Sequence, residues 1–278
     1  MRGFSLVELI VVIVVLGILG ASVAVFINNP VRAYFDGARR AALTDAGDTA
    51  VRRMLRELQD ALPNSVRITA GGGVLFLEFV PISDAGRYRA ASAGSTEPAG
   101  TDALDFADAA DTSFQVLGAP VTVPSVAGSA AQLVIFNLGH GSFDVYAGSN
   151  RRAVTTAAGA TQTIAFTPTG SAFPAESPDR RFYLVATPVT FVCAPASDGS
   201  GTIYRYSGYP LQASQPASTT AAPLASATRH LLLDRVSGCS FESTATLANA
   251  NAVAFKLQLA AGGETVTLYS QAYVSNMP

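Results

Sequence analysis

The sequence predicts an α+β protein in which one long N-terminal helix is followed by a β-rich head. An almost unbroken apolar run from Phe4 to Ile27, and helical spacing of apolar residues up to about Leu62, indicate the helix. A change of periodicity to two from Ser65 onward indicates strands with one buried face. With 278 residues, the chain is long enough for one large domain or two modest ones.

The first part of the helix, Phe4–Ile27, is long and apolar enough to span a membrane. As a helix it would measure roughly 36 Å, more than the hydrocarbon core of a bilayer. Its one ionised side chain is Glu8. A carboxylate inside a membrane span is costly, so it indicates a functional site with a specific partner. The alternative is that Glu8 lies near the helix end and only reaches the lipid headgroups.

A cleavable secretory signal is the other interpretation of this apolar run. Such a signal has its small-residue cleavage site after the apolar region, whereas Arg2 and Gly3 precede it here. Small residues between Gly17 and Ser22 imitate such a site, so the secretory signal remains a minority interpretation.

The second part of the helix, residues 28–62, is predicted to be amphipathic. Two sets of residues recur at helical spacing: Val51, Leu55, Leu58 and Leu62, and Ala38, Ala42, Ala46 and Ala50. We expect the first set to pack on the protein's own sheet. Pro30 should kink the helix, because proline lacks a backbone donor and clashes with the preceding turn, and Pro63 should end it.

Residues 63–278 form the predicted head. Two hairpins are indicated by glycine turns between alternating segments, Val66–Ile68 with Val74–Val80 and Ala252–Leu259 with Glu264–Val274. Further expected strands are Gln132–Asn137, Phe143–Tyr146, Thr163–Phe166, Phe182–Cys193, Thr202–Tyr206 and Leu231–Val236. Two segments are predicted to be surface loops, Asp84–Asp102 and Ala213–Thr228.

The composition gives no support for nucleic-acid binding, because the net charge is −2 and charged residues make up 14% of the chain. Cys193 and Cys239 are the only cysteines, so one disulfide is the only bond possible within the chain. We expect this disulfide, because export to an oxidising periplasm would permit it, and the alternative is two buried free thiols.

Catalytic and metal-binding patterns are unpersuasive, and we expect no enzyme activity, cofactor or metal. His140 and His230 are far apart and not near ligand-spaced cysteines or carboxylates. The glycine-containing segment 199–202 lacks the lysine of a phosphate-binding loop. Asp198 beside it fits a turn better than a calcium loop.

The segment Gly3-Phe4-Ser5-Leu6-Val7-Glu8 resembles the processing site of type IV prepilins and type II secretion pseudopilins. The resemblance implies a type IV pilin-like fold and a leader of residues 1–3 that a prepilin peptidase removes after Gly3. It also implies N-methylation of Phe4. Glu8 would take part in subunit assembly by pairing with the N-terminal amine of a neighbouring subunit. Independently of the resemblance, the small-residue face from Ala38 to Ala50 is also expected to meet neighbouring subunits.

Later segments resemble minor pilins of mannose-sensitive haemagglutinin pili, namely residues 56–67, 176–185, 204–209 and 274–278, together with the positions of the two cysteines. This implies a minor pilin that primes or takes part in pilus assembly, in a tip complex. The expected partners are other minor and major pilins, the prepilin peptidase, the inner-membrane assembly platform and membrane lipid.

The same resemblance implies a location in the bacterial inner membrane, with a cytoplasmic N-terminus and a periplasmic head, and later in the pilus. Three alternatives remain: a minor pseudopilin of type II secretion (J type), a tip adhesin or ligand-binding module, and, more distantly, a membrane-anchored enzyme.

Overall fold

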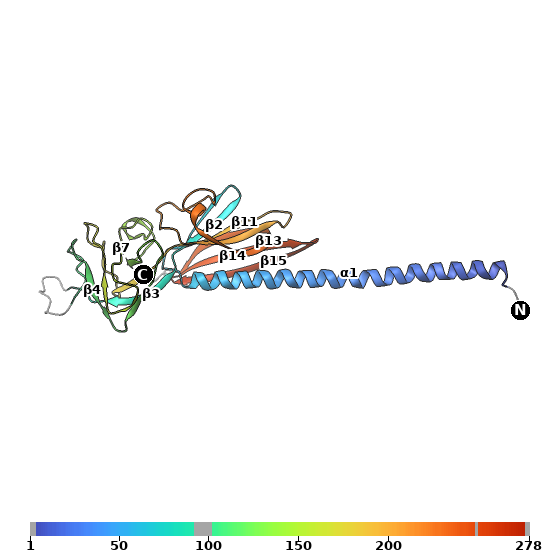
Figure 1. Ribbon diagram of the computed structural model, residues 1–278, viewed down its shortest axis with the longest axis horizontal. Coiled ribbons are helices and arrows are strands. Elements are labelled where there is room, and N and C mark those ends of the chain that lie inside the picture. The colour runs from blue at the N-terminus through green and yellow to red at the C-terminus, as the bar shows by residue number, and fades with distance from the viewer. Residues whose placement is uncertain (1–3, 92–101, 248–249, 276–278) are drawn as a thin grey trace.

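The structure is a computed structural model that describes residues 4–91, 102–247 and 250–275. A single long helix projects from a head made of β-sheets, and the N-terminal end of the helix lies far from that head (Figure 1). The expected leader 1–3, residues 92–101 of the expected loop, and residues 276–278 lie outside the described residues.

The helix α1 spans Leu6–Gln59, and its 54 residues give a length of about 81 Å at the usual rise per residue. It runs unbroken through Pro30, and Figure 1 shows no sharp bend along it. The expected kink is therefore not seen. Proline removes one backbone hydrogen bond, but intact turns on both sides let the helix propagate past it.

α1 ends three residues before the expected position at Leu62. Asp60 is the C-terminal cap, and Ala61 already pairs with Pro81 in an isolated β-bridge. The Leu62 N–H donates to the Val80 carbonyl at 2.7 Å, and the Ile82 N–H donates to the Asp60 carbonyl at 2.8 Å. The chain leaves the helix here because these backbone groups pair with a strand segment, a partner that local spacing does not reveal.

The larger sheet, here called the proximal sheet, has seven antiparallel strands and packs against the C-terminal part of α1. In spatial order these are β1 (Arg67–Gly71), β2 (Val74–Phe79), β11 (Val189–Ala194), β12 (Gly201–Ser207), β13 (Thr228–Leu247), β14 (Ala250–Ala261) and β15 (Glu264–Ser275). Both expected hairpins are present, as β1–β2 and β14–β15.

The core between α1 and the proximal sheet is apolar. From the helix come Leu43, Ala50, Val51, Met54 and Leu58, and from the sheet come Leu77, Phe79, Phe191, Val253, Phe255, Leu257 and Leu259, among others. Ala38, Ala42 and Ala46 are exposed on the helix. The stripe that packs on the sheet therefore begins at Leu43 and includes Met54, which the expected sets omitted.

The smaller sheet, here called the distal sheet, has six strands. In spatial order these are β7 (Arg151–Ala153), β6 (Gln132–Ile135), β10 (Arg181–Val185), β3 (Ile82–Tyr88), β4 (Ser113–Leu117) and β9 (Thr163–Ala165). A separate pair, β5 (Val121–Val123) with β8 (Gly159–Thr161), and two short 3-10 turns, η1 (Gly141–Phe143) and η2 (Leu224–Ser226), complete the elements.

Three strand expectations are wrong. The expected loop from Asp84 contains most of β3, an inner strand of the distal sheet. Phe143–Tyr146 is not a strand but the end of η1 and a turn. Phe182–Cys193 is not one strand, because residues 186–188 separate β10 from β11 and these belong to different sheets.

The head, expected over residues 63–278, contains two main sheets. The chain crosses from the proximal to the distal sheet between β2 and β3, and it returns between β10 and β11. Residues 82–185 are thus an insertion between two neighbouring strands of the proximal sheet. Buried Leu62, Val80, Tyr183 and Val185 pack together where the sheets meet.

Polar contacts also tie the end of the helix to the distal part of the head. The Asn137 Nδ2 donates to the Pro63 carbonyl at 2.7 Å, and the Asn64 Nδ2 donates to the Asn137 carbonyl at 3.0 Å. The Tyr146 hydroxyl donates to the Ser65 carbonyl at 2.8 Å. These contacts fix the orientation of the two sheets relative to α1.

Candidate functional site

The N-terminal part of α1 has no partner within the described chain. Every residue from Leu6 to Val23 is exposed, although this segment is the most apolar of the protein. By length and composition it is able to cross a membrane. A helix that is apolar all round is stable only when lipid or protein covers it.

The first turn of α1 is closed by a capping box between Ser5 and Glu8. The Ser5 hydroxyl accepts from the Glu8 N–H at 3.3 Å, and the Glu8 carboxylate accepts from the Ser5 N–H at 3.2 Å. The same carboxylate oxygen lies 3.3 Å from the Ser5 hydroxyl. A carboxylate in the first turn also interacts favourably with the helix dipole.

The cap gives Glu8 a neutral hydrogen-bond partner, Ser5, within its own subunit, which was not expected from the sequence. The signal was present, because Ser-x-x-Glu before an apolar run is the sequence signature of a capping box. Phe4 directly precedes the cap and is 79% exposed, and Gly3 lies outside the described residues. Removal of residues 1–3 would leave both members of the cap in place.

The comparison with protein families matches this same part of the chain. Residues 1–24 match the prokaryotic N-terminal methylation motif. The chain has the N-terminus of a type IV pilin-like or pseudopilin-like precursor. Such a motif implies processing by a prepilin peptidase and assembly with other pilins, and together with the apolar helix it fits a membrane-anchored pilin. No curated protein and no solved structure matches the chain.

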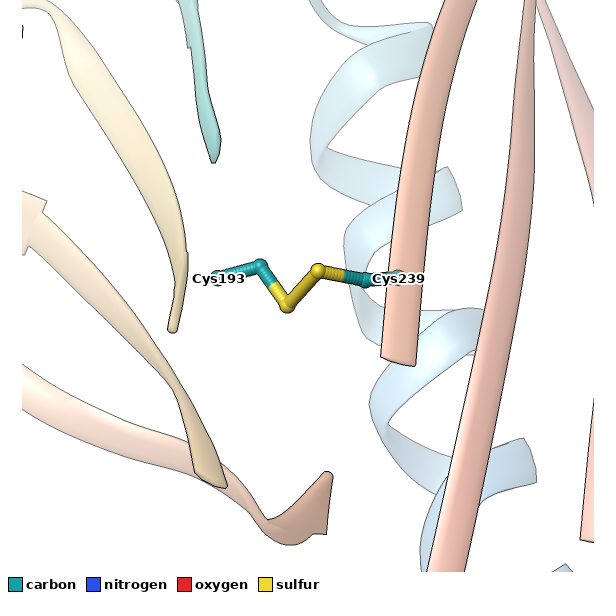
Figure 2. The surroundings of a disulfide bond; sticks show 2 residues. All are labelled: Cys193 and Cys239. Atoms are coloured by element: carbon teal, nitrogen blue, oxygen red, sulfur yellow. A yellow bond between two sulfur atoms is a disulfide. The ribbon is translucent and has the colours of Figure 1, made fainter. Parts of the chain in front are cut away.

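In the head, a disulfide joins Cys193 of β11 to Cys239 of β13. Figure 2 shows the bond crossing between the two strands, with α1 behind it. The Cα atoms are 6.8 Å apart, although β12 lies between β11 and β13 in the order of the sheet. β12 begins at Gly201, which pairs with Val236, so Cys239 lies beyond the part of β13 that pairs with β12.

A buried ionic network lies on the proximal sheet, and the sequence reasoning missed it. The Glu78 side chain is fully buried, and its carboxylate accepts from Arg67 Nε at 2.5 Å and from the Tyr209 hydroxyl at 2.9 Å. The Arg67 guanidinium lies 3.5 Å from the centre of the Tyr146 ring. Burial raises the pKa of Glu78, whereas the hydrogen bond from Arg67 opposes that rise.

The same arginine holds the expected loop 213–228 against the sheet. Its two terminal nitrogens donate to the carbonyls of Gln212 and Ala213 at 2.8 and 2.9 Å. Arg67 and Glu78 are direct partners across the β1–β2 hairpin. Counting the register outward from the glycine turn would have paired them, so the sequence contained this signal.

Within the described residues, no group of three or more histidine, cysteine or acidic side chains is arranged to hold a metal ion. The Asp198 carboxylate accepts from the N–H and the hydroxyl of Ser200 at 2.9 and 2.7 Å, which is the geometry of a turn. The geometry that carries a functional argument is therefore the exposed apolar helix and its N-terminal cap.

Proposed function

We propose that the protein is a minor type IV pilin that primes or takes part in pilus assembly, in a tip complex, after prepilin peptidase cleaves it behind Gly3. One observation carries this proposal: the methylation motif of residues 1–24 lies on a helix whose apolar residues Leu6–Val23 are all exposed. A helix of this kind is covered by lipid before assembly and by other subunits afterwards.

The proposed location is the bacterial inner membrane, with the N-terminus in the cytoplasm and the head in the periplasm, followed by transfer to the pilus. The disulfide supports the head's location, because such bonds persist in oxidising compartments such as the periplasm. Charge alone does not decide the orientation, since Arg2 precedes the apolar segment and Arg32, Arg39 and Arg40 follow it.

The finer proposal is a minor pilin similar to MshO of mannose-sensitive haemagglutinin pili. It is supported by the resemblance of residues 56–67 and 176–185, together with the two cysteine positions. A J-type pseudopilin of type II secretion is the alternative. Deletion of the gene in a cell that has both machines should abolish piliation and leave secretion intact. Loss of secretion alone would identify a pseudopilin, and intact but non-adhesive pili would identify a tip adhesin.

We propose that Gly3 is the processing site. Replacing Gly3 with leucine should block cleavage and leave a precursor that is heavier by Met1 to Gly3. Intact-mass analysis of the membrane-purified protein measures this directly. Cleavage after Ala21 or Ser22 would mean that the apolar run is a secretory signal instead.

We propose that Glu8 pairs with the N-terminal amine of a neighbouring subunit during assembly. Two unit charges 4 Å apart attract by about 1 kcal/mol in water and by about 4 kcal/mol at an effective dielectric constant of 20. Assembly in lipid would therefore favour exchange of the local cap for an ionic partner.

Two substitutions separate the charge of Glu8 from its role in the cap. Glu8→Leu removes both, whereas Glu8→Gln retains a side chain that also completes a capping box. If the charge pairs with an amine, both variants should insert into the membrane and both should lose co-purification with partner pilins. Normal co-purification of the glutamine variant would show that the cap, rather than the charge, is what assembly requires.

A further inference from the structure

The strand β15 forms one edge of the proximal sheet, and its outer side carries unpaired backbone groups. All 12 of its residues pair with β14 on the inner side without a register shift. In the described part of the chain, no strand pairs with its other side. A long exposed edge of this kind is a template for another strand unless the sequence protects it.

The protections that a strand's own sequence and pairing provide are missing from β15, although α1 packs on one face of this strand. Its single charged residue, Glu264, stands at the first position and is paired with Arg40 at 2.6 Å. The strand contains no lysine, arginine or proline, and its pairing has no bulge. The described edges elsewhere are short: β7 and β9 have three residues each, and β1 has five.

The side chains of β15 are also unusually apolar for an edge. Tyr269 and Tyr273 are 72% and 63% exposed, and they are two of the four large apolar residues that are exposed in the described head. Val266 and Leu268 on the helix-facing side are only half-buried, whereas Leu257 and Leu259 of β14 are fully buried. Exposed tyrosines and half-covered aliphatic groups are typical of a protein interface.

The hairpin geometry shows which backbone groups point outward. Gly262 and Gly263 have φ of 56° and 87°, so they form the two-residue turn that requires positive φ at both positions. The flanking pair Ala261 and Glu264 is then hydrogen-bonded, and the pattern alternates along the strand. The N–H groups of the odd-numbered residues, 265 to 273, therefore face away from β14.

The direction of β15 restricts the identity of a partner strand. Arg40 contacts Glu264, and Gly47 lies against Leu268, so β15 runs in the same direction as α1 (Figure 1). Two copies of this chain paired antiparallel through β15 would point their membrane helices in opposite directions. A symmetric pair of this kind is incompatible with two anchors in one membrane.

We propose that the outer edge of β15 accepts an extended, uncharged strand from a different pilin subunit, which continues the proximal sheet by one strand. Only an extended polypeptide matches a row of outward-facing N–H and C=O groups. The one charge on β15 itself, Glu264, is already paired with Arg40, so an uncharged strand fits this edge. This inference rests on the proposed function, because it takes the partner from the same assembly.

The test uses substitutions at Thr267, whose N–H points outward. Thr267→Pro removes that donor and leaves the β14 pairing intact, whereas the matched control Thr267→Ala removes the same side chain and retains the donor. In the full-length protein in its own cells, the proline variant should reduce co-purification of partner pilins about tenfold, and the alanine variant should not. Thermal unfolding and retention of the disulfide verify that both variants fold.

Hydrogen exchange measures the edge directly. In the purified complex, the amides of residues 265, 267, 269, 271 and 273 should exchange about tenfold more slowly than in the detergent-solubilised subunit. Unchanged exchange, or equal behaviour of the proline and alanine variants, would overturn the proposal. So would a β15–β15 disulfide between two Thr267→Cys copies, because it would identify a second copy as the partner.

The Glu8→Leu variant separates this inference from the proposed function. If Glu8→Leu abolishes co-purification with partner pilins while Thr267→Pro does not, the proposed role in assembly is supported and the proposal for the β15 edge is wrong. If neither the Glu8 variants nor deletion of the gene affects piliation, the proposed function itself is wrong.

Discussion

The two halves of α1 share one secondary structure but have opposite surroundings. From Leu6 to Val23 every residue is exposed, whereas Leu43, Met54 and Leu58 are buried against the proximal sheet. The difference follows from both the number and the arrangement of apolar residues. The first half is apolar on all sides, and the second half is apolar along one stripe.

The periodicity of apolar residues decides which sides of a helix the rest of the chain can cover. A stripe matches the flat face of a sheet, so the chain itself covers the second half. An all-round apolar surface needs a cover on every side, and a β-sheet head offers only one face. The first half must therefore be covered by molecules other than its own head.

The largest effect should come from the centre of the covered half. Met54 is fully buried, so Met54→Ala should lower the free energy of unfolding of the head by about 2–5 kcal/mol. The matched substitution Val14→Ala, at a residue 53% exposed, should leave head unfolding unchanged. Urea unfolding of both detergent-solubilised full-length variants measures the contrast. Equal decreases in the free energy of unfolding for Met54→Ala and Val14→Ala would show that both halves of α1 contribute to the stability of the head.

The disulfide should have the next largest effect, again confined to the head. Cys193 and Cys239 are separated by 46 residues, and closing a loop of that size stabilises by up to about 4 kcal/mol in the chain-entropy model. Cys193→Ala with Cys239→Ala should lower the melting temperature and leave membrane insertion unchanged. Peptide mapping of periplasmic material that recovers both thiols free would contradict the bond.

Gly20 and Gly47 lie in the first and second halves of α1, so adding one methyl group at each position compares the two halves. A Cβ at Gly47 would collide with Leu268 and come within 2.9 Å of Leu259, whereas a Cβ at Gly20 has no neighbour within 4 Å. Gly47→Ala should therefore destabilise the head by about 1–3 kcal/mol through overpacking, less the gain in helix propensity. Gly20→Ala should have no such cost. A stable Gly47→Ala head would show that the leucine side chains or α1 itself can move to make room for the methyl group.

The smallest effect should be a pH dependence from Glu78. Burial raises its pKa in the folded head, so its contribution to stability is fully present below the ordinary glutamate pKa. That contribution is lost as the pH rises through the raised value. The free energy of unfolding of the wild-type head, minus that of the Glu78→Gln head, should thus be larger near pH 4 than near pH 7. A constant difference in unfolding free energy across this range would contradict the raised pKa.

The parts of the fold that the sequence predicted are those with local signals. The β14–β15 hairpin combines strict alternation with Gly262-Gly263, and the helix combines apolar content with regular spacing. The division of Phe182–Cys193 was missed because β10 and β11 are both buried and equally apolar. Their separation depends on pairing with β3 and β2, which are about 100 residues earlier in the chain.

The same distinction applies to the candidate site. The motif around Phe4 and Glu8 is local, and the family comparison matches it. The capping box was also local, but Ser5 was interpreted only as part of the motif. The open edge of β15 was beyond prediction, because a strand is an edge only when every other strand has been placed.

The insertion of the distal sheet has a consequence for how this head tolerates change. Phe79 of β2 pairs with Val189 of β11. The residues between them therefore connect two neighbouring strands of the proximal sheet, as a hairpin turn would. A change in the length of this insertion leaves the pairing of β2 with β11 in place, as long as Asn137 and Tyr146 keep their contacts with residues 63–67. The distal sheet is thus the part of the head whose size and surface can change with the least effect on α1, the disulfide and the pairing of the proximal strands.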